Sequence, residues 1–146
     1  MGAGGERAAM SDCVFCKIRD GAIPSAKIDE DERTLTFMDI NPLGSGHCLV
    51  VTKRHAATIF EADVEDLRAA IATAKRVAVA IRQALAPDGL NMLQANGAAA
   101  FQSVPHFHLH LIPRWANDGN GFDWKLVPGD REAIVQTGER LRALLG

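Results

Sequence analysis

Residues 106–112 read His-Phe-His-Leu-His-Leu-Ile, so imidazoles alternate with apolar side chains. Side chains of a β-strand point alternately to its two faces, which puts all three histidines on one face and the apolar residues on the other. A strand rises about 3.3 Å per residue, so the outer histidines lie about 13 Å apart. Bonds from a metal to nitrogen are only about 2 Å long, so one ion cannot easily collect all three rings. We therefore expect the three histidines to have separate roles, with a two-histidine metal chelate and one spare ring as the alternative.

The composition is that of one ordinary globular domain. The chain has 146 residues, of which 47% are hydrophobic and 23% charged, and its formal net charge is −2. The chain has no basic run, so it lacks the clustered lysine and arginine that DNA or RNA binding needs, whereas a small nucleotide ligand stays compatible. The sequence also contains no apolar run long enough to span a bilayer.

The first ten residues are not expected to be part of the folded domain. Residues 1–9 lack the apolar segment of a signal peptide, and Glu6 stands where a myristoylation signal needs Ser or Thr. We expect residues 1–10 to be a leader that is either disordered or not native, and residues 11–146 to form a single domain. Without an export signal, a cytoplasmic location and free thiols are expected.

Periodicity predicts an α+β fold. We expect a short helix at 13–19, followed by strands at 27–30, 34–38, 47–52, 90–94 and 106–112, the last one ending at Pro113. Apolar residues at three- and four-residue steps predict a long helix at 63–85. Because the strands cluster on either side of this helix, the sheet is expected to have five mainly antiparallel strands.

The C-terminal extension is expected to end in a helix. Asp130 can cap this helix, and its apolar side is expected to be buried. That side consists of Ile134, Leu141, Leu144 and Leu145.

Cys13 and Cys16 form a Cys-x-x-Cys pair near the start of the domain. A thioredoxin-like motif follows a strand and opens a long helix, and no strand is expected here, so zinc is favoured over a redox pair or two inert thiols. Two cysteines make half of a tetrahedral zinc site, and the other ligands could come from His47, His55 or one of the strand histidines. Cys48 lies in an apolar strand and is expected in the core.

Gln102 and Ser103 directly precede the histidine strand and follow a run of small residues. Amide, hydroxyl and imidazole groups can all donate hydrogen bonds to phosphate oxygens. The alternative is an ordinary polar loop, and the chain has no phosphate-binding loop of the Gly-x-x-x-x-Gly-Lys-Ser/Thr type.

The sequence resembles the histidine triad (HIT) family, and most closely its Hint-like branch with the zinc-containing bacterial members. The pattern His-φ-His-φ-His-φ-φ, with φ apolar, is matched throughout by residues 106–112. Further family-like segments follow the family's order across roughly residues 12–115; they lie at 13–18, 37–42, 46–55 and 96–104.

The resemblance implies a nucleotide-binding hydrolase. Its substrate would be a derivative of a purine nucleoside 5′-monophosphate, such as AMP or GMP, and it would cleave the bond to the α-phosphate. It makes His108 the nucleophile of a nucleotidyl-histidine intermediate and assigns supporting catalytic roles to His110, His47 and Ser103. The implied nucleotide-binding residues are Asp39 at the ribose; Phe15, Ile18, Phe37 and Ile40 around the base; and Asn96, Gln102, Ser103 and His110 at the phosphate.

The resemblance also implies a homodimer and a structural Zn²⁺ held by Cys13, Cys16, His55 and His106, with no metal required for the chemistry. Three alternatives stay open: a dinucleoside polyphosphate hydrolase or phosphorylase, a non-enzymatic nucleotide-binding partner protein, and a hydrolase with catalytic zinc.

Phe101 departs from the family pattern, since small residues usually precede the Gln-Ser pair, and it either narrows the pocket or turns outward. Trp115 and Trp124 are either substrate-stacking or ordinary packing residues.

Overall fold

The computed structural model describes residues 12–122 and 125–146, so the predicted leader and Trp124 lie outside the described residues. Its elements, in chain order, are α2 (Val14–Arg19), β1 (Lys27–Glu30), β2 (Thr34–Met38), β3 (Cys48–Thr52), α3 (Val64–Leu85), β4 (Gly89–Leu93), the 3₁₀ turn η1 (Ala98–Ala100), β5 (His108–Arg114) and α4 (Arg131–Leu145). The five strands form one sheet in the order β1-β2-β3-β5-β4, and every pairing is antiparallel. The predicted α+β fold is confirmed.

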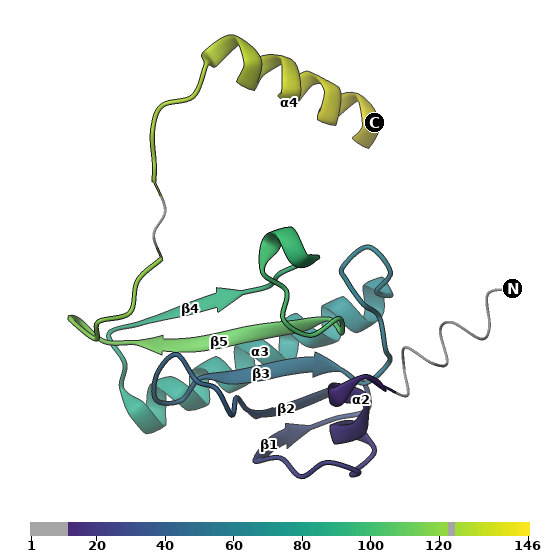
Figure 1. Ribbon diagram of the computed structural model, residues 1–146, viewed down its shortest axis with the longest axis vertical. Helices are drawn as coiled ribbons and strands as arrows, with labels where there is room; N and C mark the ends of the chain where they lie inside the picture. The colour runs from purple at the N-terminus through teal and green to yellow at the C-terminus, as the bar shows by residue number, and fades with distance from the viewer. Residues whose placement is uncertain (1–11, 123–124) are drawn as a thin grey trace, which may run out of the picture.

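Two apolar clusters lie on the two faces of this sheet. Figure 1 shows the long helix α3 along one of these faces. On one face, Val50 and Leu111 pack with Ala70, Ala74 and other residues of α3, and Cys48 belongs to this core as predicted. On the other face, α2 lies over β2 and β3, and the residues of this second cluster are Cys13, Phe15, Cys16, Leu35, Phe37, Leu49 and Val51. Since α2 is only six residues long, part of this second face is left without a covering helix.

The long helix α3 begins and ends where the sequence predicts. Asp63 caps its first turn by accepting a hydrogen bond from the backbone N–H of Glu65 at 2.8 Å, and Ala86 ends it in the left-handed region at φ 47°. Alanines at positions 70 and 74 let the helix axis approach the sheet closely. No helix in the described ranges is both long enough and apolar enough to cross a membrane.

The histidine strand differs from its predicted range at both ends. β5 begins at His108, because the chain is still turning at residue 106: the N–H of His106 bonds to Val104 O and that of Phe107 to Ala56 O. The strand also continues through Pro113 to Arg114. Pairing with β3 stops at Leu111, so at Pro113 β5 has a neighbouring strand on one side only, and a missing N–H is tolerated there.

The C-terminal helix α4 forms as predicted, but its predicted buried side is exposed. The Asp130 carboxylate accepts a hydrogen bond from Ala133 N–H at 3.2 Å. The relative exposure of Ile134 is 61% and that of Leu144 is 86%, and Leu141 and Leu145 are exposed too. Figure 1 shows α4 standing away from the sheet at the end of an extended segment. The periodic pattern identifies an apolar side, but it does not identify the surface that covers it.

Gly46, in the loop before β3, is the glycine whose replacement we expect to be most costly. Its φ is +83°, and a Cβ there would lie 2.5 Å from Leu85 Cδ1 and 3.0 Å from Pro113 Cγ. We expect Gly46→Ala to lower the free energy of unfolding by about 1–3 kcal/mol in urea titrations. Gly44→Ala is the matched control, because its new Cβ would meet only Asn120 Nδ2, at 3.6 Å. Equal losses in both variants would contradict this account of the loop.

Candidate functional site

The strand register places two histidines on the sheet face that α3 leaves uncovered. Phe37, Leu49, His110 and Leu93 pair in one row across four strands, and His108 pairs with Val51 on the same face. An open cavity of about 760 Å³ lies over this face and is lined by both histidines. Its volume is within the range typical of small-molecule sites.

His108 is a buried ring whose tautomer is fixed by a backbone carbonyl. Its Nδ1 lies 2.6 Å from the carbonyl oxygen of His106, and because a carbonyl can only accept, Nδ1 carries the proton. The ring packs against the edge of Phe15, with centroids 5.0 Å apart, and against His110 at 4.8 Å. Burial lowers the pKa of His108, which keeps the ring neutral. Its Nε2 therefore carries a lone pair.

A second chain of hydrogen bonds fixes the tautomer of His110. The backbone N–H of Leu43 donates to His47 Nδ1 at 3.0 Å, so the proton of neutral His47 is on Nε2. That Nε2 lies 2.9 Å from His110 Nδ1, which must accept, and His110 then carries its own proton on Nε2. Burial and the neighbouring His108 and His47 lower the pKa of His110 to about 4, so it acts as a neutral hydrogen-bond donor.

The hydrogen bonds from Leu43 to His47 and on to His110 argue against a metal ion between Asp39, His47 and His110. Ligand atoms of Asp39, His47 and His110 lie within 4.8 Å of one another, which is close enough for a shared ion. The lone pair of His47 on Nδ1 is already used by Leu43 N–H, however, so its Nε2 holds a proton and cannot ligate. Asp39 Oδ2 lies 3.4 Å from that nitrogen, as an electrostatic partner. Spacing in the sequence gives no signal for this backbone contact.

The predicted nucleotide-binding residues divide into two groups. Phe15, Ile18, Phe37, Asp39, Ile40 and Ser103 line the cavity. Gln102 uses both ends of its amide within the loops, since Oε1 accepts from Gly97 N–H at 2.7 Å and Nε2 donates to Ala57 O at 2.6 Å. Asn96 likewise bonds to Ile59 N–H and to the side chain of Gln94. These two amides therefore shape the loops beside the cavity.

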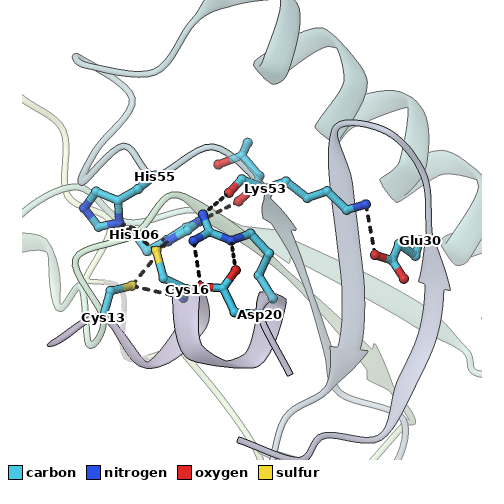
Figure 2. A network of polar contacts seen from close by, with 9 residues as sticks. Cys13, Cys16, Asp20, Glu30, Lys53, His55 and His106 are labelled. Carbon is cyan, nitrogen blue, oxygen red and sulfur yellow. Dashed lines mark hydrogen bonds and ion pairs between the residues drawn. The ribbon is translucent and has the colours of Figure 1, made fainter. Parts of the chain in front are cut away.

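Cys13, Cys16, His55 and His106 converge beside the cavity as a candidate metal centre (Figure 2). Four distances between their ligand atoms are 3.2–3.6 Å, measured between His55 Nδ1 and His106 Nδ1 and from the two sulfurs to these nitrogens. Tetrahedral zinc with bonds of about 2.0–2.3 Å requires about 3.3–3.8 Å between ligand atoms. His106 donates from Nε2 to Thr52 O at 2.6 Å, which leaves its Nδ1 lone pair for a metal. The residues therefore fit zinc.

Neighbouring polar contacts tie this cluster to the sheet (Figure 2). Arg19, in the last turn of α2, donates to the carbonyl oxygen of Lys53 at 2.6 Å and pairs with Asp20 at 2.9 Å. The Lys53 ammonium in turn lies 2.9 Å from the Glu30 carboxylate on β1. These contacts and the candidate metal ligands join α2 to the sheet at the same end.

Comparison with known proteins identifies the family of this chain. Residues 20–117 match the model of the HIT domain, so the chain belongs to the HIT (histidine triad) family. A crystal structure of a HIT family protein from Bacillus subtilis superimposes with a TM-score of 0.85 at 39% identity, covering 90% of this chain and 96% of that one. Adenosine 5′-monophosphoramidase hnt1 of Schizosaccharomyces pombe is 38% identical over 88% of this chain and 95% of its own. A zinc-bound histidine triad family protein from Mycobacterium smegmatis has a TM-score of 0.73 at 35% identity, covering 90% of this chain and 99% of that one.

The lowered pKa of His110 predicts a loss of stability in mild acid. The ring stays neutral in the folded chain down to about pH 4, whereas unfolded histidine titrates near 6.5. The unfolded chain therefore binds more protons in this window, and the free energy of unfolding decreases as the pH falls from 7 to 5. Urea titrations of wild type and His110→Gln should show the smaller decrease in the variant, because it lacks this titrating ring. The same pH dependence in both proteins would contradict this assignment.

Proposed function

We propose that the protein is a nucleoside phosphoramidase, which hydrolyses the P–N bond of a purine nucleoside 5′-phosphoramidate by way of a nucleotidyl-histidine intermediate. The observation that carries this proposal is His108: a buried, neutral imidazole whose Nδ1–H is held by a carbonyl and whose Nε2 lone pair is left for attack. Relatives named as adenosine 5′-monophosphoramidases support the reaction type.

In the first step, His108 Nε2 forms a bond to the α-phosphorus while the P–N bond breaks. The departing amine nitrogen takes a proton from the Ser103 hydroxyl, which recovers one from solvent at the exposed rim of the cavity. His108 becomes positively charged, and its Nδ1–H bond to the His106 carbonyl stabilises that charge. His110 donates from Nε2 to a phosphate oxygen.

In the second step, water attacks the same phosphorus and the bond to His108 Nε2 breaks. The proton released by the water leaves by the reverse route through Ser103, and neutral His108 is restored. The products are the nucleoside 5′-monophosphate and the amine. His47 is a positioning residue here, because it acts by holding the tautomer of His110.

The apolar part of the cavity over α2 and β2 fits the base of the nucleotide. Phe15, Ile18 and Phe37 line it, and Ile40 lies at its edge with 88% of its surface exposed. Asp39 would accept hydrogen bonds from the ribose hydroxyls, since one carboxylate matches a vicinal diol. Its Oδ1 already accepts from Asn41 N–H at 2.8 Å, which fixes the carboxylate orientation.

The charges around the cavity favour an amine leaving group over a polyphosphate. Among the described residues that line the cavity there is no lysine or arginine. A dinucleoside polyphosphate would bring several negative charges that such a lining does not neutralise. A phosphoramidate has one charged phosphate, which the His110 Nε2–H and the Ser103 hydroxyl can hold.

Zinc, when bound by Cys13, Cys16, His55 and His106, is proposed to be structural. These four side chains would supply every position of a tetrahedral site, which would leave none open for substrate or water. Its contribution would be to fasten α2, and with it Phe15, against the sheet that carries His108.

We also propose a homodimer. β4 is an edge strand of the sheet, and Leu90 and Met92 on it are exposed at 38% and 49%. Open edges and exposed apolar side chains are typical of surfaces that pair with another chain. Light scattering that gives the mass of a monomer would overturn this part of the proposal.

The proposed function is tested by measuring AMP release from adenosine 5′-phosphoramidate with and without EDTA. We expect the wild type to release AMP and ammonia, and brief EDTA treatment to leave the initial rate unchanged. If the protein binds AMP but releases none from the substrate, the binding-protein alternative is right. Immediate loss of turnover with EDTA would favour the catalytic-zinc alternative.

A further inference from the structure

Phe101 combines an unfavourable backbone conformation with a side chain that is almost fully exposed to solvent. Its φ of 63° lies in the left-handed region, which a bulky aromatic residue rarely adopts, and 92% of its surface is exposed. Yet this side chain is among those that line the cavity over His108. A strained, exposed aromatic residue at a ligand cavity suggests a role in binding rather than in folding.

The loop that carries Phe101 is held in place by hydrogen bonds. The Phe101 N–H donates to Ala98 O at 3.0 Å, closing η1, and the next N–H, from Gln102, donates to Gly97 O at 3.2 Å. The Gln102 side chain then joins Gly97 to Ala57 on a different loop. Figure 1 shows the chain turning beyond the end of β4, where η1 lies. Phe101 directly follows η1 and lines the cavity, so an anchored loop presents this side chain.

The direction of attack predicts which part of the substrate this rim meets. His108 Nδ1 faces back to the chain at His106, so Nε2 faces the cavity. An in-line displacement places the leaving group on the side of phosphorus opposite to Nε2, away from His108 and toward the rim. Phe101, exposed at 92%, is the most exposed of the large apolar residues that line the cavity.

We propose that Phe101 is a specificity-determining residue that packs on the leaving group and favours phosphoramidates of amines that carry an aromatic ring, such as benzylamine, over the unsubstituted phosphoramidate. This inference rests on the proposed function for the identity of the reaction. An aromatic ring on the amine would stack on Phe101 and remove apolar surface of both partners from water. Ammonia, as a leaving group, would not reach it.

The test compares the N-benzyl amide of AMP with adenosine 5′-phosphoramidate as substrates of wild type and Phe101→Gly. Glycine accepts the left-handed backbone, so the loop keeps its shape and only the ring is lost. We expect kcat/KM for the benzyl substrate to fall about tenfold, and that for the unsubstituted substrate to change less than about twofold. Phe60→Gly is the matched control, because Phe60 is 87% exposed and is not part of the cavity lining.

Equal losses on both substrates, or no change in their ratio, would overturn the role of Phe101. A binding experiment keeps this result separate from the proposed function. In a His108→Ala background, calorimetry measures the affinity of the two compounds, and Phe101→Gly should weaken the benzyl compound selectively. If the wild type turns over neither substrate, the proposed function is wrong, while the ratio of affinities still decides for or against Phe101.

Discussion

His108→Ala is expected to reduce AMP release from adenosine 5′-phosphoramidate by at least about 10³-fold. No other described side chain has the same combination of a fixed proton on Nδ1, a lone pair on Nε2 and a place at the base of the cavity. His110 cannot replace it, because its Nδ1 accepts from His47 and its Nε2 carries the proton. The rate constant is measured under single-turnover conditions with enzyme in excess.

Two controls separate loss of the nucleophile from loss of the site. The His108→Ala protein should retain the wild-type zinc content and bind AMP with an affinity within a few-fold of the wild type. His47→Ala should be affected less than His108→Ala, because His47 positions His110 and does not contact phosphorus in this account. A His108→Ala enzyme that keeps more than a tenth of the wild-type rate would exclude the covalent mechanism.

Cys13→Ser is expected to abolish stoichiometric zinc binding and to lower the melting temperature by at least about 10 °C. The Cys13 sulfur lies 3.3 Å from His106 Nδ1, and removing one of the four candidate ligands would leave an incomplete tetrahedral site. α2 would then keep its apolar contacts with β2 and β3 but lose the link that the metal would provide. Elemental analysis of the purified protein gives the zinc content, and calorimetry gives the melting temperature.

Cys48→Ala is the matched control for this experiment. Cys48 is also buried, but it packs against α3 on the opposite face of the sheet, away from the candidate metal ligands. We expect this variant to keep one zinc per chain and to lose only the stability of a small core truncation, about 1–2 kcal/mol. If Cys13→Ser keeps its zinc, or melts no lower than Cys48→Ala, the metal centre is not as described.

Regular patterns in the sequence predicted most of the fold. The 3.6-residue period of α3 and the two-residue period of the histidine strand are set by local geometry. The first appears along the whole helix and the second from His108 onward, so His106 lies outside the strand. The start of β5 depends instead on a loop distant in sequence, where the carbonyl oxygen of Ala56 accepts a hydrogen bond from the Phe107 N–H. The exposure of α4 could not be predicted either, since an amphipathic pattern does not show what covers the apolar side.

The candidate site was predictable in its residue types and less so in its hydrogen bonds. Cys-x-x-Cys and the alternating histidines identified the groups that come together. The direction of each bond depends on backbone groups remote in sequence, such as Leu43 N–H at His47 and Ala57 O at Gln102. These contacts determine which nitrogen of each histidine carries a proton, and hence the role of each ring.

The stereochemical course at phosphorus tests the central claim most directly. The substrate is an adenosine 5′-phosphoramidate made chiral at phosphorus with one sulfur, hydrolysed in isotopically labelled water. Two successive in-line displacements, one by His108 and one by water, predict net retention of configuration. Net inversion would mean a single attack by water, and it would contradict the nucleotidyl-histidine intermediate on which this account depends.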